Sequence, residues 1–252
     1  MIPKKIHYCW LGGKELPEDA QMCIDTWKKI LPDYELICWN ENNFDINSVD
    51  FVKEAISVKK WAFAADYIRL YAVYTQGGVY MDTDVIVKKS FDKFLKHSFF
   101  TAIEVNDPKT SNALLGGSKE EVRKYLLQSA IFGAEAGNKY IKSCMDWYKD
   151  KHFILPDGSF FNKYVAPDIY AEVAEKYGLQ KKDTLQDLGN GMVIYPSIVF
   201  TNDRYGATKE TYAIHWWKGT WRDKNLLQKI LSFVSRKIFL LRNFNGRQNN
   251  DA

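Results

Sequence analysis

Two carboxylates one residue apart, Asp82 and Asp84, are the residues of this sequence whose types and spacing point most directly to chemistry. Short apolar runs flank them at 79–81 and 85–87, so Asp82 directly follows one predicted buried strand and Asp84 directly precedes another. Carboxylate oxygens so arranged can face one hard divalent cation, and Mg²⁺ and Mn²⁺ also accept phosphate oxygens from a substrate. An Asp-x-Asp pair alone is a weak indication, because most such pairs lie in solvated turns. The flanking apolar runs make a cation site the more informative interpretation of this pair.

A second charged pair, Asp66 and Arg69, lies three residues apart on a predicted helix over 61–76, so the two side chains share a face. One interpretation is an intrahelical ion pair worth a few tenths of a kcal/mol. The helix is otherwise rich in alanine and large apolar residues, however, and an unpaired charge in a buried helix is costly. The other interpretation is therefore a buried arginine aimed at a sugar or phosphate. Both remain open on this helix alone.

The elements that must position these residues follow from the apolar pattern. Strands over 6–11 and 34–39 with a helix over 17–30 between them form a βαβ beginning, which favours a parallel sheet. The helix over 61–76 should stop at Gly77-Gly78. We expect further strands at 99–104, 113–116, 193–195 and 212–215, and helices at 49–58, 119–132, 138–149 and 167–177. The pattern predicts an α/β protein.

Composition excludes several classes of protein. The 252 residues are 46% hydrophobic and 26% charged, which is typical of a soluble globular domain. A net charge of +4 is too small to indicate nucleic-acid binding. The four cysteines lack metal-site spacing, which favours free thiols in a reducing compartment. The N-terminus does not resemble a signal sequence and no apolar run reaches 18 residues, so we expect a cytoplasmic protein.

Three segments, in order along the chain, resemble the DXD sugar-transferase family, glycosyltransferase family 32. They are Ile2-Pro3-Lys4-Lys5-Ile6-His7-Tyr8-Cys9-Trp10-Leu11-Gly12, then Phe63-Ala64-Ala65-Asp66-Tyr67-Ile68-Arg69-Leu70-Tyr71 with Gly77-Gly78-Val79-Tyr80-Met81-Asp82-Thr83-Asp84-Val85, and His215-Trp216-Trp217-Lys218-Gly219-Thr220-Trp221. Such enzymes serve in capsule and surface polysaccharide synthesis and in yeast mannan initiation, and clostridial glucosylating toxins share the core. The resemblance implies a GT-A fold over residues 1–221, with a Rossmann-like, mostly parallel central sheet flanked by helices.

The resemblance also implies roles for individual residues. The catalytic group comprises Asp66, Arg69, Asp82 and Asp84. The group that binds the nucleotide sugar comprises Cys9, Trp10, Asn112, Thr220 and Trp221. In the metal site, Asp84 would be a direct ligand and Asp82 would divide its contacts between donor and metal. His215 lies where related transferases place a metal- or diphosphate-binding group.

Several of these residues also have an ordinary structural explanation. Trp10 lies in an apolar strand and could be core. His215, flanked by Ile214 and two tryptophans, could be a core histidine with satisfied hydrogen bonds. Glu104 and Asp168 follow apolar runs; either could meet an acceptor, but exposed charge is the simpler expectation.

The C-terminal region is basic. Apolar residues recur at roughly helical spacing over 222–243 with lysine and arginine between them, which predicts an amphipathic helix. This helix could pack on the domain or lie on an anionic membrane surface, and both interpretations remain open. Residues 244–252 are polar and expected to be disordered.

The resemblance, together with the paired carboxylates, therefore implies a metal-dependent, retaining glycosyltransferase that uses Mn²⁺ or Mg²⁺. It would move a hexose from a nucleotide sugar, with UDP-galactose or UDP-glucose favoured, to a glycan or lipid-linked acceptor in capsule or surface polysaccharide synthesis. It would be cytoplasmic, with the inner face of the membrane as an alternative. A toxin-like enzyme that glycosylates a host protein is a second possibility, although the short length argues against it. A non-catalytic nucleotide-sugar-binding module is a third, which the retained acidic residues disfavour.

Overall fold

A mixed β-sheet forms the centre of the protein, with strand order β2-β1-β3-β7-β5-β9-β8 and β6 paired to β5. The computed structural model describes residues 1–105, 124–161, 164–202 and 207–216. The strands are β1 (Lys5–Cys9), β2 (Glu35–Trp39), β3 (Gly78–Met81), β4 (Val85–Val87), β5 (Phe99–Val105), β6 (Tyr125–Leu127), β7 (Ile131–Ala134), β8 (Gln186–Asp187), β9 (Met192–Tyr195), β10 (Phe200–Thr201) and β11 (Ala213–His215). The α-helices are α1 (Glu18–Ile30), α2 (Asp50–Ser57), α3 (Trp61–Gln76), α5 (Lys139–Trp147) and α6 (Ala166–Glu175).

Most strands of the large sheet run in one direction. Strand β1 pairs in parallel with β2 and β3, and β5 pairs in parallel with β9. Strand β7 is antiparallel to both β3 and β5, so these two point the same way on either side of it. The edge strand β8 is antiparallel to β9. The predicted α/β fold with a mostly parallel sheet is confirmed, with β7 as an antiparallel strand inserted in its middle.

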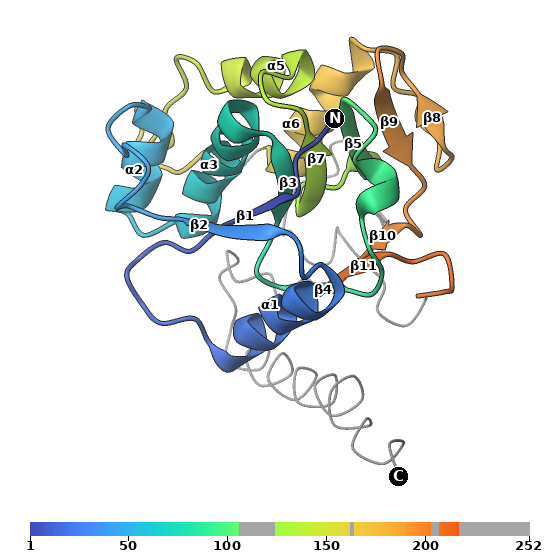
Figure 1. Ribbon diagram of the computed structural model, residues 1–252. Coiled ribbons are helices and arrows are strands. Elements are labelled where there is room, and N and C mark those ends of the chain that lie inside the picture. The colour runs from blue at the N-terminus through green and yellow to red at the C-terminus, as the bar shows by residue number, and fades with distance from the viewer. Residues whose placement is uncertain (106–123, 162–163, 203–206, 217–252) are drawn as a thin grey trace, which may run out of the picture. The chain divides into compact units, whose positions relative to one another are not determined.

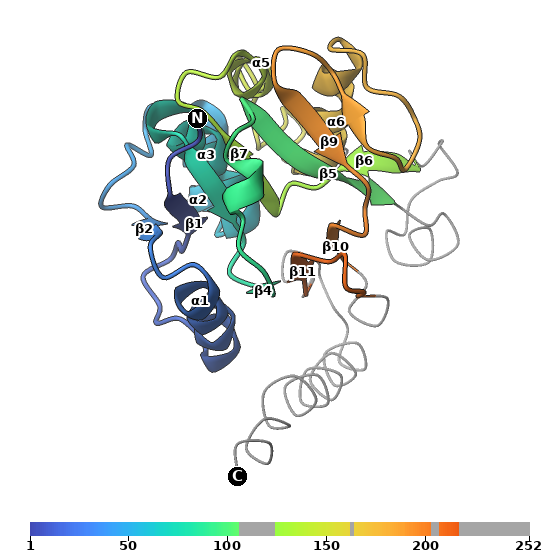
Figure 2. The same ribbon diagram turned by 45° about the vertical axis from the view of Figure 1, so that its right-hand side comes forward.

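Alternation of side chains along the strands gives the sheet two covered faces. Val79 and Met81 of β3 belong to the same buried cluster as Trp27 of α1. Tyr80 lies between them in sequence and faces the other way, where Arg69 of α3 lies over its ring. Figures 1 and 2 show α1 on one side of the large sheet and α3, α5 and α6 on the other.

A small three-stranded sheet, β10-β11-β4, lies below the large one in Figure 2. Helix α1 fixes its edge strand β4: the Trp27 indole Nε1 donates to the Val85 carbonyl at 2.7 Å, and the Val87 amide donates to Thr26 Oγ1 at 3.0 Å. Strand β11 runs antiparallel to β4, with His215 opposite Val85. This register brings the late segment of the chain next to the Asp82-Thr83-Asp84 turn.

The helix predicted over 61–76 is confirmed as α3, and its stop has a visible cause. Gly77 has φ of 64°, and a Cβ there would lie 2.9 Å from the Ala136 amide nitrogen. Only glycine takes this conformation and this close contact without strain. The chain then enters β3 at once, so a single residue separates the helix from the strand that leads to Asp82.

The helix predicted over 119–132 is wrong for its described part. Tyr125–Leu127 is strand β6 and Ile131–Ala134 is strand β7. Leucine and isoleucine at 126, 127 and 131 suit a helix locally, but pairing with β3 and β5, which are distant in sequence, decides the structure.

Some predictions lie outside the described residues. These are the strand at 113–116, Asn112, Thr220, Trp221, the amphipathic helix over 222–243 and the tail 244–252. Among the helices that are described, none combines the length and the apolar character that a membrane span requires.

Candidate functional site

The predicted site residues gather at the carboxyl ends of the neighbouring parallel strands β1 and β3. The paired residues His7 and Tyr80 put Cys9 and Asp82 level with each other two positions further on. The chain continues from β1 to β2 on one side and later returns as β3 on the other. In open α/β sheets, ligands bind at the carboxyl ends of strands at such a switch point. The location fits a donor site.

Backbone hydrogen bonds hold the Asp82-Thr83-Asp84 turn in place. The Asp82 amide donates to the Ala130 carbonyl at 3.0 Å, and the Val85 amide donates back to the Asp82 carbonyl at 3.0 Å. The Trp216 amide donates to the Asp84 carbonyl at 2.8 Å. The turn is therefore fixed by the β6–β7 connection on one side and the end of β11 on the other.

The Arg69 guanidinium is the cationic centre of the site. Its Nη2 lies 2.9 Å from Asp66 Oδ1 and 3.4 Å from Asp82 Oδ1. Its Nη1 donates to the Ser129 carbonyl at 3.0 Å, and its Cζ lies 4.8 Å from the Tyr80 ring centroid. The Arg69 side chain is 5% exposed. Arg69 therefore forms the intrahelical ion pair with Asp66, and it is also a buried arginine that reaches Asp82 at the candidate site.

Burial, opposed by Arg69, raises the pKa of Asp66 above its usual range. Asp82 is more exposed, at 25%, and accepts a hydrogen bond from the Tyr80 hydroxyl at 2.7 Å. The two carboxylates that share Arg69 thus have unequal environments. Asp66 depends on the arginine for its charge, whereas Asp82 has a second donor and access to solvent.

Asp82, Asp84 and His215 form a candidate divalent-metal site. One ligand atom from each lies within 4.8 Å of the others. Two carboxylate oxygens and an imidazole nitrogen, close together and partly open, form a donor set that fits Mn²⁺ or Mg²⁺. The structure thus brings together the three residues that were predicted to bind a metal.

His215 is held toward Asp84, with Nε2 3.3 Å from Asp84 Oδ1. Burial disfavours its charged form, but the carboxylate of Asp84, helped by Asp82 and Glu104, outweighs this and raises the pKa of His215. Its buried Nδ1 has no hydrogen-bond partner in the part of the chain that the structure describes. His215 is buried, as a core histidine would be, but only one of its ring nitrogens has a partner among the described residues.

Cys9 and Trp10 lie at the end of β1 beside this cluster. Burial raises the pKa of the Cys9 thiol to about 12, so the side chain is uncharged and is a poor nucleophile. The Trp10 side chain is partly exposed, and its indole nitrogen donates to the Lys14 carbonyl. Trp10 is therefore only partly buried, and not plain core.

Glu104 neighbours the site, contrary to the expectation of an exposed charge. It is partly buried rather than exposed, as is Asp168. Burial raises the pKa of Glu104, and His215, which lies close enough to interact with it, opposes the shift. Glu104 accepts a hydrogen bond from Asn202, whose Oδ1 accepts from Gln128 Nε2 at 2.6 Å.

Tyr80 and Ser129 both contact Arg69, and neither was predicted to be part of the site. Tyr80 carries a signal that could have been used, since its place in the strand before Asp82 requires it to face the α3 side. Ser129 carries none, because it contributes a backbone carbonyl.

The fold and the site define an α/β protein with an Asp-x-Asp turn at the carboxyl edge of its mostly parallel sheet. Residues 17–101 match the model of the family described as "Glycosyltransferase sugar-binding region containing DXD motif". This match, which covers residues 17–101, confirms the resemblance to the DXD-containing glycosyltransferases. In this family the region implies a nucleotide-sugar donor and a divalent metal in general.

Curated relatives are similar over part of their length. "Subversion of eukaryotic traffic protein A" of Legionella pneumophila is 21% identical over 244 residues, covering 85% of this chain and 34% of the relative. "Inositol phosphoceramide mannosyltransferase 3" of Schizosaccharomyces pombe is 29% identical over 104 residues, covering 38% of this chain and 28% of the relative. The chain thus matches about a third of the length of these relatives. The solved PaToxG glycosyltransferase is 18% identical, covers 69% of each chain and has a TM-score of 0.47.

Proposed function

We propose that the protein transfers a hexose from a UDP-hexose to a glycan or lipid-linked acceptor, with retention of anomeric configuration and with Mn²⁺ or Mg²⁺ bound. The observation that carries the proposal is the convergence of Asp82, Asp84 and His215 beside the Asp66–Arg69 pair. A metal site and a buried guanidinium, side by side at the end of β3, can together receive a diphosphate.

The chemistry requires stabilisation of the negative charge that develops on the departing nucleoside diphosphate. A divalent cation held by Asp82, Asp84 and His215 would supply Lewis-acid neutralisation of that charge. Arg69 adds a fixed positive charge that needs no rearrangement during reaction, because Asp66, Ser129 and the Tyr80 ring already hold it. Asp82 would orient donor hydroxyls, and Cys9 and Trp10 would border the base.

Retention by front-face attack, without a covalent glycosyl-enzyme, is the mechanism we favour. The carboxylates of Asp66 and Asp82 are occupied by Arg69. Glu104 is the carboxylate near the cluster that best tests this preference, since within the described residues it forms no ion pair with Arg69 or with the candidate metal ligands. Mass spectrometry of the protein incubated with a slow fluorinated donor should show no sugar adduct. An adduct on Glu104 would replace front-face attack by double displacement.

The acceptor has a second candidate class. The Legionella relative, which aligns with most of this chain, is named for subversion of eukaryotic traffic, so a protein acceptor is the alternative to a glycan. Transfer of radiolabelled hexose into protein of a eukaryotic lysate, compared with transfer into a lipid or glycan fraction, distinguishes the two.

The test of the main proposal is hydrolysis of the donor without an acceptor. We expect slow release of UDP from UDP-glucose or UDP-galactose with Mn²⁺, and far less from GDP-mannose. Asp84→Asn should abolish it. Asp25→Asn, which changes an exposed carboxylate on α1, should not. Hydrolysis that is unchanged in Asp84→Asn, or absent with every nucleotide sugar, would refute the proposal.

A further inference from the structure

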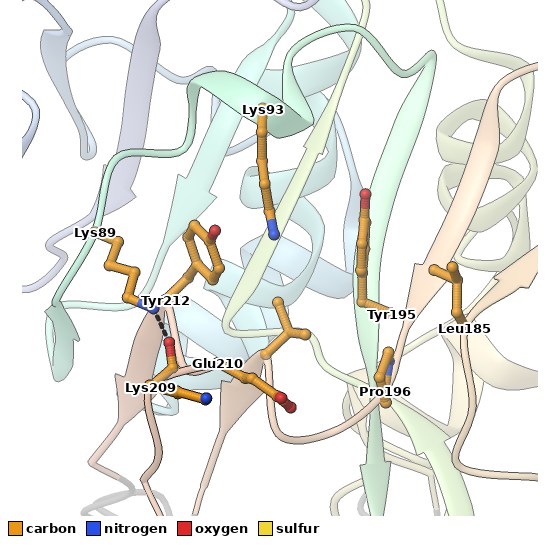
Figure 3. A pocket seen from close by; sticks show the side chains of 9 residues that line it. Lys89, Lys93, Leu185, Tyr195, Pro196, Lys209, Glu210 and Tyr212 are labelled. Carbon is orange, nitrogen blue, oxygen red and sulfur yellow. Dashed lines mark hydrogen bonds between the residues drawn. The ribbon is translucent and has the colours of Figure 1, made fainter.

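A concave pocket lies at the end of the small sheet away from the metal ligands. Its volume is about 350 Å³, within the roughly 300 to 1,000 Å³ of small-molecule sites. The lining consists of Lys89, Lys93, Leu185, Tyr195, Pro196, Val199, Lys209, Glu210 and Tyr212 (Figure 3). Tyr212 immediately precedes β11, and His215 ends it, which at about 3.3 Å per residue separates the pocket from the metal ligands by about 10 Å. The two sites are distinct.

The pocket is cationic. Three lysines and one glutamate line it. In the described part of the chain, no carboxylate forms an ion pair with Lys93, whose ammonium instead lies 3.9 Å from the Tyr212 ring centroid and 5.8 Å from that of Tyr195. Aromatic faces hold a cation in place but leave its charge able to attract an anion. Exposed lysines are common without a counterion, and the feature that distinguishes Lys93 is that its ammonium lies near the rings of Phe94, Tyr195 and Tyr212.

The walls are preorganised. The Lys89 ammonium donates to the Lys209 carbonyl, which ties the loop before β11 to the end of β4 (Figure 3). The Lys88 amide donates to the Tyr212 carbonyl at 2.8 Å, and the Tyr195 hydroxyl bonds His97 Nε2 at 2.8 Å. A site whose walls are already hydrogen-bonded loses little conformational entropy when a ligand binds.

The other walls are apolar. Val199 is buried, and Leu185 is 61% exposed, so the lining offers both covered and accessible aliphatic surface. Aromatic and aliphatic walls suit the C–H face of a sugar ring, and the lysines suit a carboxylate or phosphate on that ring. A bare inorganic anion would use the lysines alone.

We propose that this pocket is a second ligand site, which binds an anionic sugar unit: a pyranose that carries a carboxylate or a phosphate. Its ring packs on the side of the pocket that Tyr195 and Leu185 line, and its anion meets Lys93, with Lys89 and Lys209 at the rim. The use of this site as an anchor for an acidic acceptor glycan rests on the proposed transfer reaction. The binding itself does not.

Methyl-labelled protein provides the test, because Leu185 and Val199 both carry methyl groups in the pocket. The probes are glucuronic acid and glucose 6-phosphate, with glucose and inorganic phosphate for comparison, in EDTA so that the metal site does not bind them. We expect both anionic sugars to shift the methyl resonances of Leu185 and Val199. Glucose should not shift them, and inorganic phosphate should bind about tenfold more weakly than the anionic sugars, the ratio that corresponds to about 1.4 kcal/mol.

Lys93→Gln should weaken anionic-sugar binding about tenfold, the loss expected for a charge-assisted contact, and Lys93→Arg should retain it. Lys96→Gln, an exposed lysine in the same segment but outside the pocket, is the matched control. Equal binding of inorganic phosphate, an unchanged affinity in Lys93→Gln, or no shift with either anionic sugar would overturn the proposal. Binding without donor hydrolysis would count against the transferase proposal alone, and hydrolysis without binding against this one alone.

Discussion

Removal of the Arg69 guanidinium should have large effects whose origin the structure specifies. Arg69→Met keeps an unbranched apolar stem but removes the guanidinium that donates to two carboxylates and to the Ser129 carbonyl. Loss of one partner from a buried ion pair costs about 3–5 kcal/mol. That is a large part of the roughly 5–15 kcal/mol by which a typical domain is stable. We therefore expect Arg69→Met to reduce the free energy of unfolding by about 3–5 kcal/mol.

The two carboxylates should contribute unequally to this loss. Asp66 is 14% exposed, and burial already raises its pKa, so it is the charge that becomes stranded. Asp82 is more exposed and keeps the hydrogen bond from Tyr80. In the Arg69→Met background, Asp66→Asn should therefore recover about 1–3 kcal/mol, and Asp82→Asn clearly less.

Urea unfolding followed by tryptophan fluorescence measures these differences. EDTA keeps the metal site empty, and a pH of about 8 keeps the unfolded-state carboxylates ionised. Arg69→Lys is the matched control, since it retains the charge but not the two-pronged geometry, and it should fall between wild type and Arg69→Met. A loss below about 1 kcal/mol in Arg69→Met, or equal recovery from the two asparagine variants, would refute the reasoning.

Three further perturbations have expected outcomes. The His7 ring bonds the Gly77 carbonyl at 2.8 Å and accepts from the Trp39 indole at 3.0 Å, and burial lowers the pKa of this histidine. Because the unfolded chain then takes up the proton first, the free energy of unfolding should fall as the pH drops below about 6.5, with a smaller slope in His7→Gln. Gly78→Ala places a Cβ 2.9 Å from His7 Nε2 and the Lys5 carbonyl at φ of 120°, and should cost more in thermal unfolding than Gly158→Ala, which has φ of 79° but nothing within 4 Å. Mn²⁺ at a hundred times its Kd should stabilise the wild type by about 2.7 kcal/mol in a thermal shift assay and should not stabilise Asp84→Asn; equal stabilisation of both would remove Asp84 from the ligand set.

The sequence pattern of a segment was sufficient to predict its secondary structure where interactions within that segment determine it. The α3 helix was predicted over the residues it occupies, because its apolar run is long and Gly77 ends it with a positive φ. The strands β1 and β2 and the helix between them followed in the same way. The region of β6 and β7 could not be predicted, because Gly133 sits against the Phe100 ring and β7 fills the gap between two strands that come from other parts of the chain. Such pairing is not visible in a segment's own residues.

Some residues of the candidate site could also be predicted from the sequence, and others could not. Asp66, Arg69, Asp82 and Asp84 could be named from the types and spacing of their side chains, and His215 from the family resemblance; the structure brings them together. The burial of Glu104 could not, since it depends on Asn202 and Gln128, which reach it from distant segments.

A single strand register connects the candidate metal site with the proposed second ligand site. His215 stands opposite Val85 in the β4–β11 pair, which places its ring beside Asp84, and the Tyr212 carbonyl accepts from the Lys88 amide at the other end. A slip of one residue would turn every side chain of β11 to the opposite face. It would remove His215 from the ligand set and Tyr212 from Lys93 in one step. The Trp27 indole, which donates to the Val85 carbonyl, helps to fix β4 against such a slip, so Trp27→Phe should weaken Mn²⁺ binding and anionic-sugar binding together. Loss of one without the other would show that the two ends of the small sheet are held independently.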